Sequence, residues 1–244
     1  MRPIRLLWMY PDIMDLYGDS GNILVFEKRC AWRNIPLEII TCSIGEEVDF
    51  NTIDILFMGG GADREQGKIF ADLVKRKDAI LKAMENGMLS MLICGGYQLF
   101  GKYYEDSDGV KLDGLGIFDY YTIADGKTRS IGNIAIEVEL MGETISVVGF
   151  ENHGGQTYSV QKPLGKVLAG GGNCHDGYEG YFDGKTLGTY LHGPLLPKNP
   201  EIADYFISEA LKLQGSDMKL QLLNDSLAKE AKNSMLNRIL QKKD

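Results

Sequence analysis

The chain has 244 residues, of which 44% are hydrophobic and 25% are charged, as in an ordinary globular protein with one sizeable core. Its formal net charge of −8 argues against nucleic acid or an anionic membrane surface as the main partner. No apolar run reaches the length of a membrane span, no signal-peptide pattern is present, and the four cysteines show no CxxC spacing. We therefore expect a cytoplasmic protein with reduced thiols and a single domain over 1–244, its core at 4–211.

The first half of the chain alternates short apolar strands with helices. Strands are predicted at 4–9, 37–42, 53–58 and 88–93, and helices at 22–33 and 65–86. This alternation is typical of an α/β fold with a mixed, mostly parallel sheet flanked by helices. The third strand runs into three glycines at 59–61, but Ala62 and Ile69 break the spacing of a phosphate-binding loop. We expect instead a backbone-rich turn at the carboxyl edge of the sheet, where α/β ligand sites form.

From residue 115 onward the pattern indicates more antiparallel, hairpin-like structure. Strands are predicted at 115–123, 132–140, 144–149 and 186–191, and helices at 200–213 and 217–241. The last helix carries apolar residues at helical spacing, which predicts packing on the chain's own core; a surface for a partner is the alternative.

A candidate nucleophile follows the strand at 88–93, in the sequence CGGYQ at 94–98. A buried strand that ends at a cysteine, two glycines and a helix-compatible segment predicts a nucleophile elbow. The helix N-terminus would activate the thiol and offer free N–H groups to an oxyanion. The alternative is a buried core cysteine before a turn. The combination of a strand, Cys94, two glycines and the polar Gln98 favours the nucleophile.

A thiol nucleophile needs a base, and the chain has three histidines. His192 ends an apolar strand and is favoured, because strand ends in a parallel sheet meet at one edge. His153 lies in a glycine-rich loop and remains the second candidate. His175 adjoins Cys174, but no second ligand pair accompanies them, so we expect no metal site.

Several separated segments resemble class I glutamine amidotransferases of the cobyric acid synthase-like (CobB/CobQ-like) branch. They are YGDSGN at 17–22, CGGYQ at 94–98, RSIGN at 129–133, GFENHGGQTY at 149–158, GTYLHGP at 188–194 and LLPKNP at 195–200. The resemblance spans residues 10–211 and is strongest to glutaminase subunits that serve a MurT-type ligase.

The resemblance implies a flavodoxin-like class I glutamine amidotransferase fold and hydrolysis of L-glutamine to glutamate and ammonia. Cys94 would form the glutamyl thioester, and His192 would accept the thiol proton and pass it to the departing ammonia. Backbone N–H groups of Gly60, Gly61 and Gly95 would stabilise the oxyanion.

The resemblance also implies a substrate site. Arg129 would bind the α-carboxylate of glutamine with its planar fork of donors; without the resemblance it would be read as a surface arginine. Gln98 would position the substrate, its alternative role being to cap the elbow helix. His153 and Gln156 would line the same site.

No segment resembles an ATP site, so the chain is expected to hold no cofactor of its own. By resemblance it forms a heterodimer with a MurT-type, Mur ligase-like subunit that carries ATP and Mg. That subunit would activate the D-glutamate of the lipid II stem peptide, and ammonia would convert it to D-isoglutamine in peptidoglycan synthesis. The chain would then act at the inner face of a bacterial membrane through its substrate.

Two departures from the broader class I pattern are visible. Leu92 stands where many members have a glycine, and Pro194 occupies the position of the usual glutamate two residues after the histidine. A base histidine normally has a third group that fixes its tautomer, so either the chain works with a Cys–His dyad or a partner supplies a carboxylate. We expect the second, and therefore a weak glutaminase in the isolated chain.

The sequence is also compatible with three other functions. They are an amidotransferase for another acceptor such as a corrinoid, a Cys–His hydrolase of peptides or γ-glutamyl compounds, and a catalytically degenerate regulatory partner.

Overall fold

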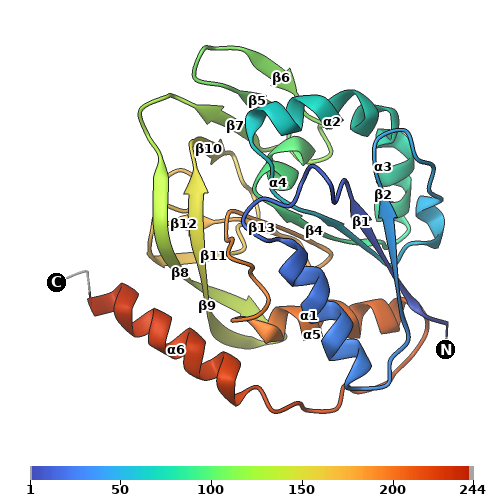
Figure 1. Ribbon diagram of the computed structural model, residues 1–244. Helices are drawn as coiled ribbons and strands as arrows, with labels where there is room; N and C mark the ends of the chain where they lie inside the picture. Colours follow the sequence, from blue (N-terminus) through green and yellow to red (C-terminus); the bar gives the residue numbers. More distant parts are fainter. Residues whose placement is uncertain (1, 242–244) are drawn as a thin grey trace.

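The computed structural model, which describes residues 2–241, is built around a six-stranded central sheet (Figure 1). Its strand order is β13-β14-β4-β3-β1-β2. The strands are β1 (Ile4–Met9), β2 (Leu37–Cys42), β3 (Ile55–Met58), β4 (Leu89–Ile93), β14 (Thr186–Thr189) and β13 (Tyr181–Phe182). All neighbours pair in parallel except β13 with β14. The prediction of a mixed, mostly parallel α/β sheet flanked by helices is therefore confirmed.

Helices cover both faces of this sheet. On one side α1 (Ser20–Ala31) packs against α5 (Pro200–Leu213), and on the other lie α2 (Asp63–Lys75), α3 (Lys77–Glu85) and the short α4 (Gly95–Phe100) (Figure 1). Because the sheet is covered twice, β3 and β4 are buried along their whole length. A 3₁₀ turn, η1 (Phe50–Thr52), leads into β3.

The single helix predicted at 65–86 is two helices, which break at Arg76. The guanidinium of Arg76 bonds to Asp72 at 2.7 Å and to the carbonyl of Glu46 at 2.6 Å, and so ties the helix break to the loop after β2. No glycine or proline marks this position. The break depends on long-range contacts that helical periodicity does not reveal.

Residues 103–179 form two smaller sheets, in line with the hairpin-like pattern predicted from residue 115 onward. One has the order β10-β7-β5-β6 and contains β10 (Gly155–Tyr158), β7 (Tyr121–Ala124), β5 (Tyr103–Glu105) and β6 (Lys111–Asp113). The other has the order β12-β11-β8-β9 and contains β12 (Tyr178–Glu179), β11 (Gly165–Ala169), β8 (Ser130–Leu140) and β9 (Glu143–His153).

The strand predicted at 115–123 is mostly a loop, and only β7 is extended there. The backbone N–H of Leu115 donates to the carbonyl of Leu99, and those of Ile117 and Phe118 donate to the carbonyl of Phe100. This loop therefore satisfies the carbonyls at the end of α4 instead of pairing with a strand.

The helix predicted at 217–241 begins only at Ser226, as α6 (Ser226–Leu240). Its last turns pack Met235 and Ile239 against β8 and β9, whereas Leu227 is 79% exposed. The predicted packing on the chain's own core therefore holds for the C-terminal half of α6 alone. None of the helices in residues 2–241 has the length and apolar character that crossing a bilayer requires.

An ion-pair network fixes the start of α6. Arg29 is buried on α1 and bonds to Asp204 and Asp225, each at 2.6 Å, and Arg33 bonds to Asp204 at 2.7 Å. Hydrogen bonding to Arg29 holds the pKa of the Asp225 carboxyl below its usual value. Asp225 directly precedes α6, so this network connects the C-terminal helix to the core.

We expect Arg29→Ala to lower the free energy of unfolding by about 2–3 kcal/mol, because the half-buried Asp225 loses its arginine partner and Asp204 keeps only Arg33. Arg5→Ala, which breaks an exposed pair with Glu38, is the control and should cost less than about 1 kcal/mol. Denaturant titration measures both, and equal losses in the two variants would contradict the role of the network.

Candidate active site

Four loops meet at the carboxyl edge of the central sheet, because β1, β3, β4 and β14 all run in parallel. The loop after β1 brings Asp19, the glycines at 59–61 follow β3, Cys94 follows β4, and His192 lies three residues beyond β14. The predicted nucleophile and base therefore come from neighbouring strands.

Cys94 occupies a sharp turn between β4 and α4. Its φ of 48° and ψ of −103° are unusual for a residue with a side chain, at a cost of order 1–3 kcal/mol. The turn is held by the Cys94 N–H, which donates to Thr189 at 2.8 Å, and by the Cys94 carbonyl, which accepts from the N–H of Gln98 at 2.9 Å. A Cβ on Gly96 would lie 2.7 Å from the carbonyl oxygen of Met58. This is the backbone geometry of a nucleophile elbow.

Gly60 lies where the nucleophile, the base and a carboxylate converge. A Cβ on Gly60 would stand 2.9 Å from Cε1 of His192, 3.3 Å from Cβ of Cys94 and 3.3 Å from Oδ2 of Asp19. The N–H of Gly60 donates to Asp19 at 2.7 Å, so it is not free for an oxyanion. The predicted oxyanion role of Gly60 is corrected accordingly. The lack of a side chain at Gly60 instead leaves room for Cys94, His192 and Asp19 to approach one another. Gly61, which lines the cavity, and Gly95 remain the predicted donors.

Asp19 is the acidic partner that the sequence analysis missed. Asp19 and His192 are both fully buried, and Oδ1 of Asp19 lies 3.7 Å from Nδ1 of His192. Neither these two atoms nor Nε2 of His192 has a hydrogen-bond partner in residues 2–241. A carboxylate of the chain itself therefore faces the base, just beyond hydrogen-bond distance. The expected carboxylate from a partner remains a prediction.

The charges around His192 favour its protonated form. Burial alone would lower the pKa of His192, but the neighbouring Cys94 and the Asp19 carboxylate raise it to about 10. An imidazolium beside Cys94 is the state that follows transfer of the thiol proton.

The backbone around His192 is fixed from two sides. His192 exchanges both backbone hydrogen bonds with Phe150 of β9, at 2.7 and 3.2 Å. The buried carboxylate of Glu179 accepts from the N–H of Tyr190 at 2.7 Å and from the hydroxyl of Thr189. Burial raises the pKa of Glu179 to about 8. The base is therefore carried by a rigid backbone.

A cavity of about 530 Å³ opens beside Cys94 and is large enough for an amino acid. It is lined by five of the residues predicted for the site, Gly61, Cys94, Gln98, Arg129 and His153. Gln156 and His192 are buried behind this lining, and the contact of Gln156 with substrate stays a prediction.

Gln98 and His153 form part of the cavity wall. The Gln98 amide donates to the Tyr190 hydroxyl at 3.1 Å and accepts from Gln66 at 3.0 Å, and Gln66 also donates to the carbonyl of Gly61. Nδ1 of His153 donates to the carbonyl of Gly155 at 2.7 Å, and its ring stacks on Tyr190 with centroids 3.7 Å apart. His153 is thereby held in the wall, which leaves His192 as the base.

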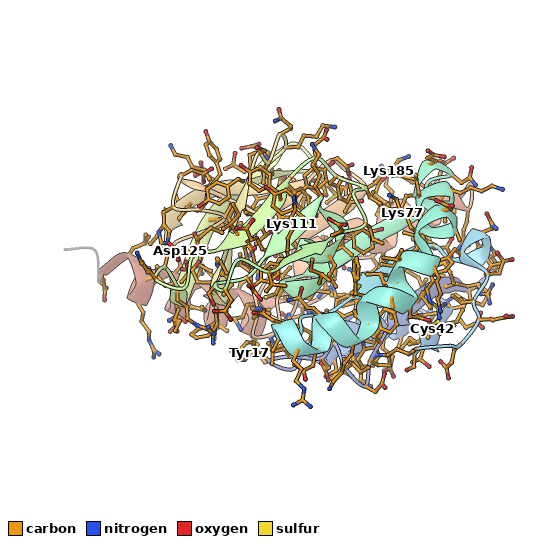
Figure 2. All side chains as sticks on the ribbon, turned by 90° about the horizontal axis from the view of Figure 1, so that it is seen from above. Tyr17, Cys42, Lys77, Lys111, Asp125 and Lys185 are labelled. Carbon is orange, nitrogen blue, oxygen red and sulfur yellow. The ribbon has the colours of Figure 1, made fainter. Side chains whose placement is uncertain are left out.

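Arg129 lies at the exposed mouth of the cavity and is held by Asn152. Its Nε and Nη2 donate to Oδ1 of Asn152 at 3.1 and 2.8 Å. Nδ2 of Asn152 donates to the hydroxyl of Tyr17, whose ring meets the His192 ring edge-on with centroids 5.0 Å apart. Figure 2 labels Tyr17 and Asp125, which mark the two loops that border the cavity here.

The part of the chain that the structure describes contains no group of three or more His, Cys, Asp or Glu side chains able to hold a metal ion. Nε2 of His175 lies 3.3 Å from the Ser130 hydroxyl, and Cys174 is half-buried beside it.

Comparison with known families and proteins agrees with this geometry. Residues 5–200 match the CobB/CobQ-like glutamine amidotransferase domain. The chain is 41% identical to the lipid II isoglutaminyl synthase (glutamine-hydrolyzing) subunit GatD of Staphylococcus aureus, over 98% of this chain and 97% of that protein. It is 37% identical to the subunit of the same name from Streptococcus pneumoniae, over 93% of this chain and 88% of that one.

A probable cobyric acid synthase of Methanocaldococcus jannaschii is 34% identical over 70% of this chain, but the match covers only 36% of that protein. Among solved structures, a glutamine amidotransferase has a TM-score of 0.54 at 16% identity, covering 86% of this chain and 99% of that one. The glutaminase domain of Trypanosoma brucei CTPS has a TM-score of 0.52 at 14% identity, covering 89% and 96%. At these identities the structural matches show the fold alone.

We expect Gly60→Ala to lower kcat/KM for the hydrolysis of glutamine, the substrate implied by the resemblance, by about 100-fold. The new methyl group would displace the buried His192 ring, and a misplacement of about 1 Å is enough for such a loss. Gly67→Ala is the control, because a Cβ on Gly67 meets no atom within 4 Å. Steady-state kinetics measure both, and full activity of Gly60→Ala would contradict the packing described here.

Asp19→Asn should lower kcat by about 100-fold or more and also change the pH profile. Because Asp19 helps to raise the pKa of His192 to about 10, its neutralisation lowers that pKa and moves the alkaline limb of kcat/KM to lower pH. The pH dependence of glutamate release tests this, with the exposed Asp78→Asn as control. An unchanged alkaline limb would exclude Asp19 as the partner of His192.

Proposed function

This chain belongs to the CobB/CobQ-like glutamine amidotransferase family, and we propose that it is the glutamine-hydrolysing subunit of a lipid II isoglutaminyl synthase. The observation that carries the proposal is the convergence of Cys94, His192 and Asp19 around Gly60, beside a cavity of about 530 Å³. The identity to the two GatD subunits, which extends over nearly the whole chain, supports the same function.

The reaction begins when Sγ of Cys94 attacks the side-chain amide carbon of glutamine. His192 takes the thiol proton and delivers it to the amide nitrogen, which departs as ammonia and leaves a glutamyl thioester on Cys94. Water then adds to the thioester with His192 as base, and glutamate leaves as the thiol re-forms. Asp19 stabilises the imidazolium in both steps, because it is a buried negative charge 3.7 Å from the ring.

The two ends of glutamine bind in different parts of the cavity. Arg129 at the mouth binds the α-carboxylate, for which a planar fork of donors is well suited. The side-chain amide reaches Cys94 at the inner end, where N–H groups of Gly61 and Gly95 stabilise the oxyanion. The hydrogen bonds that Gln66 donates to Gln98 and to the carbonyl of Gly61 hold the glycine loop at 59–61 against α4.

Ammonia is useful only if an acceptor captures it. We propose that the acceptor is prepared by a MurT-type, Mur ligase-like subunit, which uses ATP and Mg to activate the D-glutamate of the lipid II stem peptide. The heterodimer then yields D-isoglutamine, and its lipid-linked substrate brings it to the inner face of the bacterial membrane. The name of the two close relatives supports lipid II as the acceptor class.

The competing functions have less support. The match to the probable cobyric acid synthase covers about a third of that protein, whereas it covers nearly all of the S. aureus GatD subunit. A peptide hydrolase has no need for an arginine at the mouth of an amino-acid-sized cavity. A regulatory protein without catalysis has no need for a buried Cys–His–Asp cluster.

We expect the purified chain to release glutamate from glutamine slowly, and its complex with the ligase subunit to do so at least about tenfold faster. The physical reason is the 3.7 Å gap between Asp19 and His192, since catalytic hydrogen bonds that are long in a free enzyme tighten in the working complex. Glutamate release measures this, and Cys94→Ala should abolish it.

The variant Cys174→Ala is the control, because Cys174 lies outside the cavity lining. Release that survives Cys94→Ala, or no release even with the ligase and its lipid substrate, would exclude the proposed function. Full activity of the free chain without gain from the ligase would contradict the activation by the partner.

A further inference from the structure

Asn152 connects the substrate-binding arginine with the side chain that covers the catalytic base. It lies on β9 between Phe150, which pairs with the backbone of His192, and His153 in the cavity wall. Asn152, Arg129 and Tyr17 all line the cavity. Neither the family motifs nor the proposed reaction assigns Asn152 a role.

The chemistry of its neighbours fixes the orientation of the Asn152 amide. A guanidinium can only donate hydrogen bonds, so Oδ1 of Asn152 must face Arg129 and Nδ2 must face the Tyr17 hydroxyl. Both ends of the amide therefore form hydrogen bonds, Oδ1 with the loop that carries Arg129 and Nδ2 with the loop that carries Tyr17.

This arrangement prepares Arg129 for a carboxylate. Its Nε–H and one N–H of Nη2 are bound to Asn152, at 3.1 and 2.8 Å. The remaining three N–H groups lie on Nη1 and Nη2, and this end of a guanidinium binds a carboxylate with two parallel hydrogen bonds. Without Asn152, an exposed arginine side chain loses the contacts that fix its direction, and binding must then order it.

The other end of the amide reaches the base. Tyr17 holds a φ of 60°, and its ring lies edge-on to the His192 ring with centroids 5.0 Å apart. The hydrogen bond from Asn152 anchors the Tyr17 hydroxyl, and so keeps the ring between His192 and the solvent at the mouth.

We propose that Asn152 is a positioning residue, which directs Arg129 toward the glutamine carboxylate and anchors Tyr17 over His192. The inference rests on the proposed function, since it assigns a role in the binding of the same substrate. It adds a residue that acts through two others and contacts neither Cys94 nor His192.

The test is steady-state glutamate release by the complex with the ligase subunit, with KM and kcat measured separately. Asn152→Ala should raise KM for glutamine about tenfold with a smaller effect on kcat. Arg129→Ala should raise KM further, and the double variant should match Arg129→Ala, because Asn152 acts through the arginine. Asn133→Ala, an exposed asparagine on β8 outside the cavity lining, is the matched control.

Asn152→Asp separates positioning from folding, because it keeps the size of the side chain and an acceptor for Arg129. The new carboxylate forms an ion pair with the Arg129 guanidinium and competes with the α-carboxylate of glutamine, so KM should rise at least as much as in Asn152→Ala. Tyr17→Phe keeps the ring and removes the hydroxyl, so its effect on KM should be smaller than that of Asn152→Ala.

A normal KM in Asn152→Asp, or additive effects of Asn152→Ala and Arg129→Ala, would overturn the role of Asn152. Failure of the proposed function looks different, since the wild-type complex itself would then release no glutamate.

Discussion

The structure depends on the close approach of three loops at one glycine. The carboxyl ends of β1, β3, β4 and β14 lie at one edge, but four strands side by side do not by themselves bring side chains into contact. Gly60 allows that contact, because a single added carbon would meet Cys94, His192 and Asp19 at once. Its N–H also binds Asp19, and so orients the carboxylate that raises the pKa of His192. The same residue therefore determines both the spacing and the electrostatics of the site.

Much of the fold could be predicted from local pattern. β1, β2 and α5 have the predicted bounds, because their apolar runs are bordered by prolines or turns. Cys94 and His192 were identifiable because each follows a buried strand of the parallel sheet. The break between α2 and α3 at Arg76 and the start of α6 at Ser226 depend on contacts between distant segments, which a local sequence pattern does not contain.

The site was less predictable than the fold. Asp19 was inside a motif that supported the family resemblance, yet nothing in that motif shows that it faces His192. Its carboxylate is held near His192 by the N–H of Gly60, a residue from a distant loop. Gly60 was expected to offer its N–H, and Gln156 to contact substrate, because sequence gives a residue's position but not its direction. The hydrogen bond that the Gly60 N–H donates to Asp19 corrects the first expectation, and the second stays a prediction. Asn152 lies in the motif at 149–158, but that motif does not show that its amide joins the loops of Arg129 and Tyr17.

The central claim is that the chemistry takes place on Cys94 of this chain, and trapping the intermediate tests it most directly. Rapid acid quench of the complex during turnover of glutamine, followed by peptide mass spectrometry, would locate the glutamyl thioester. We expect an adduct on the peptide that contains Cys94 and none on those with Cys30, Cys42 or Cys174. Steady release of glutamate with no adduct on Cys94, or with an adduct on another cysteine, would contradict it.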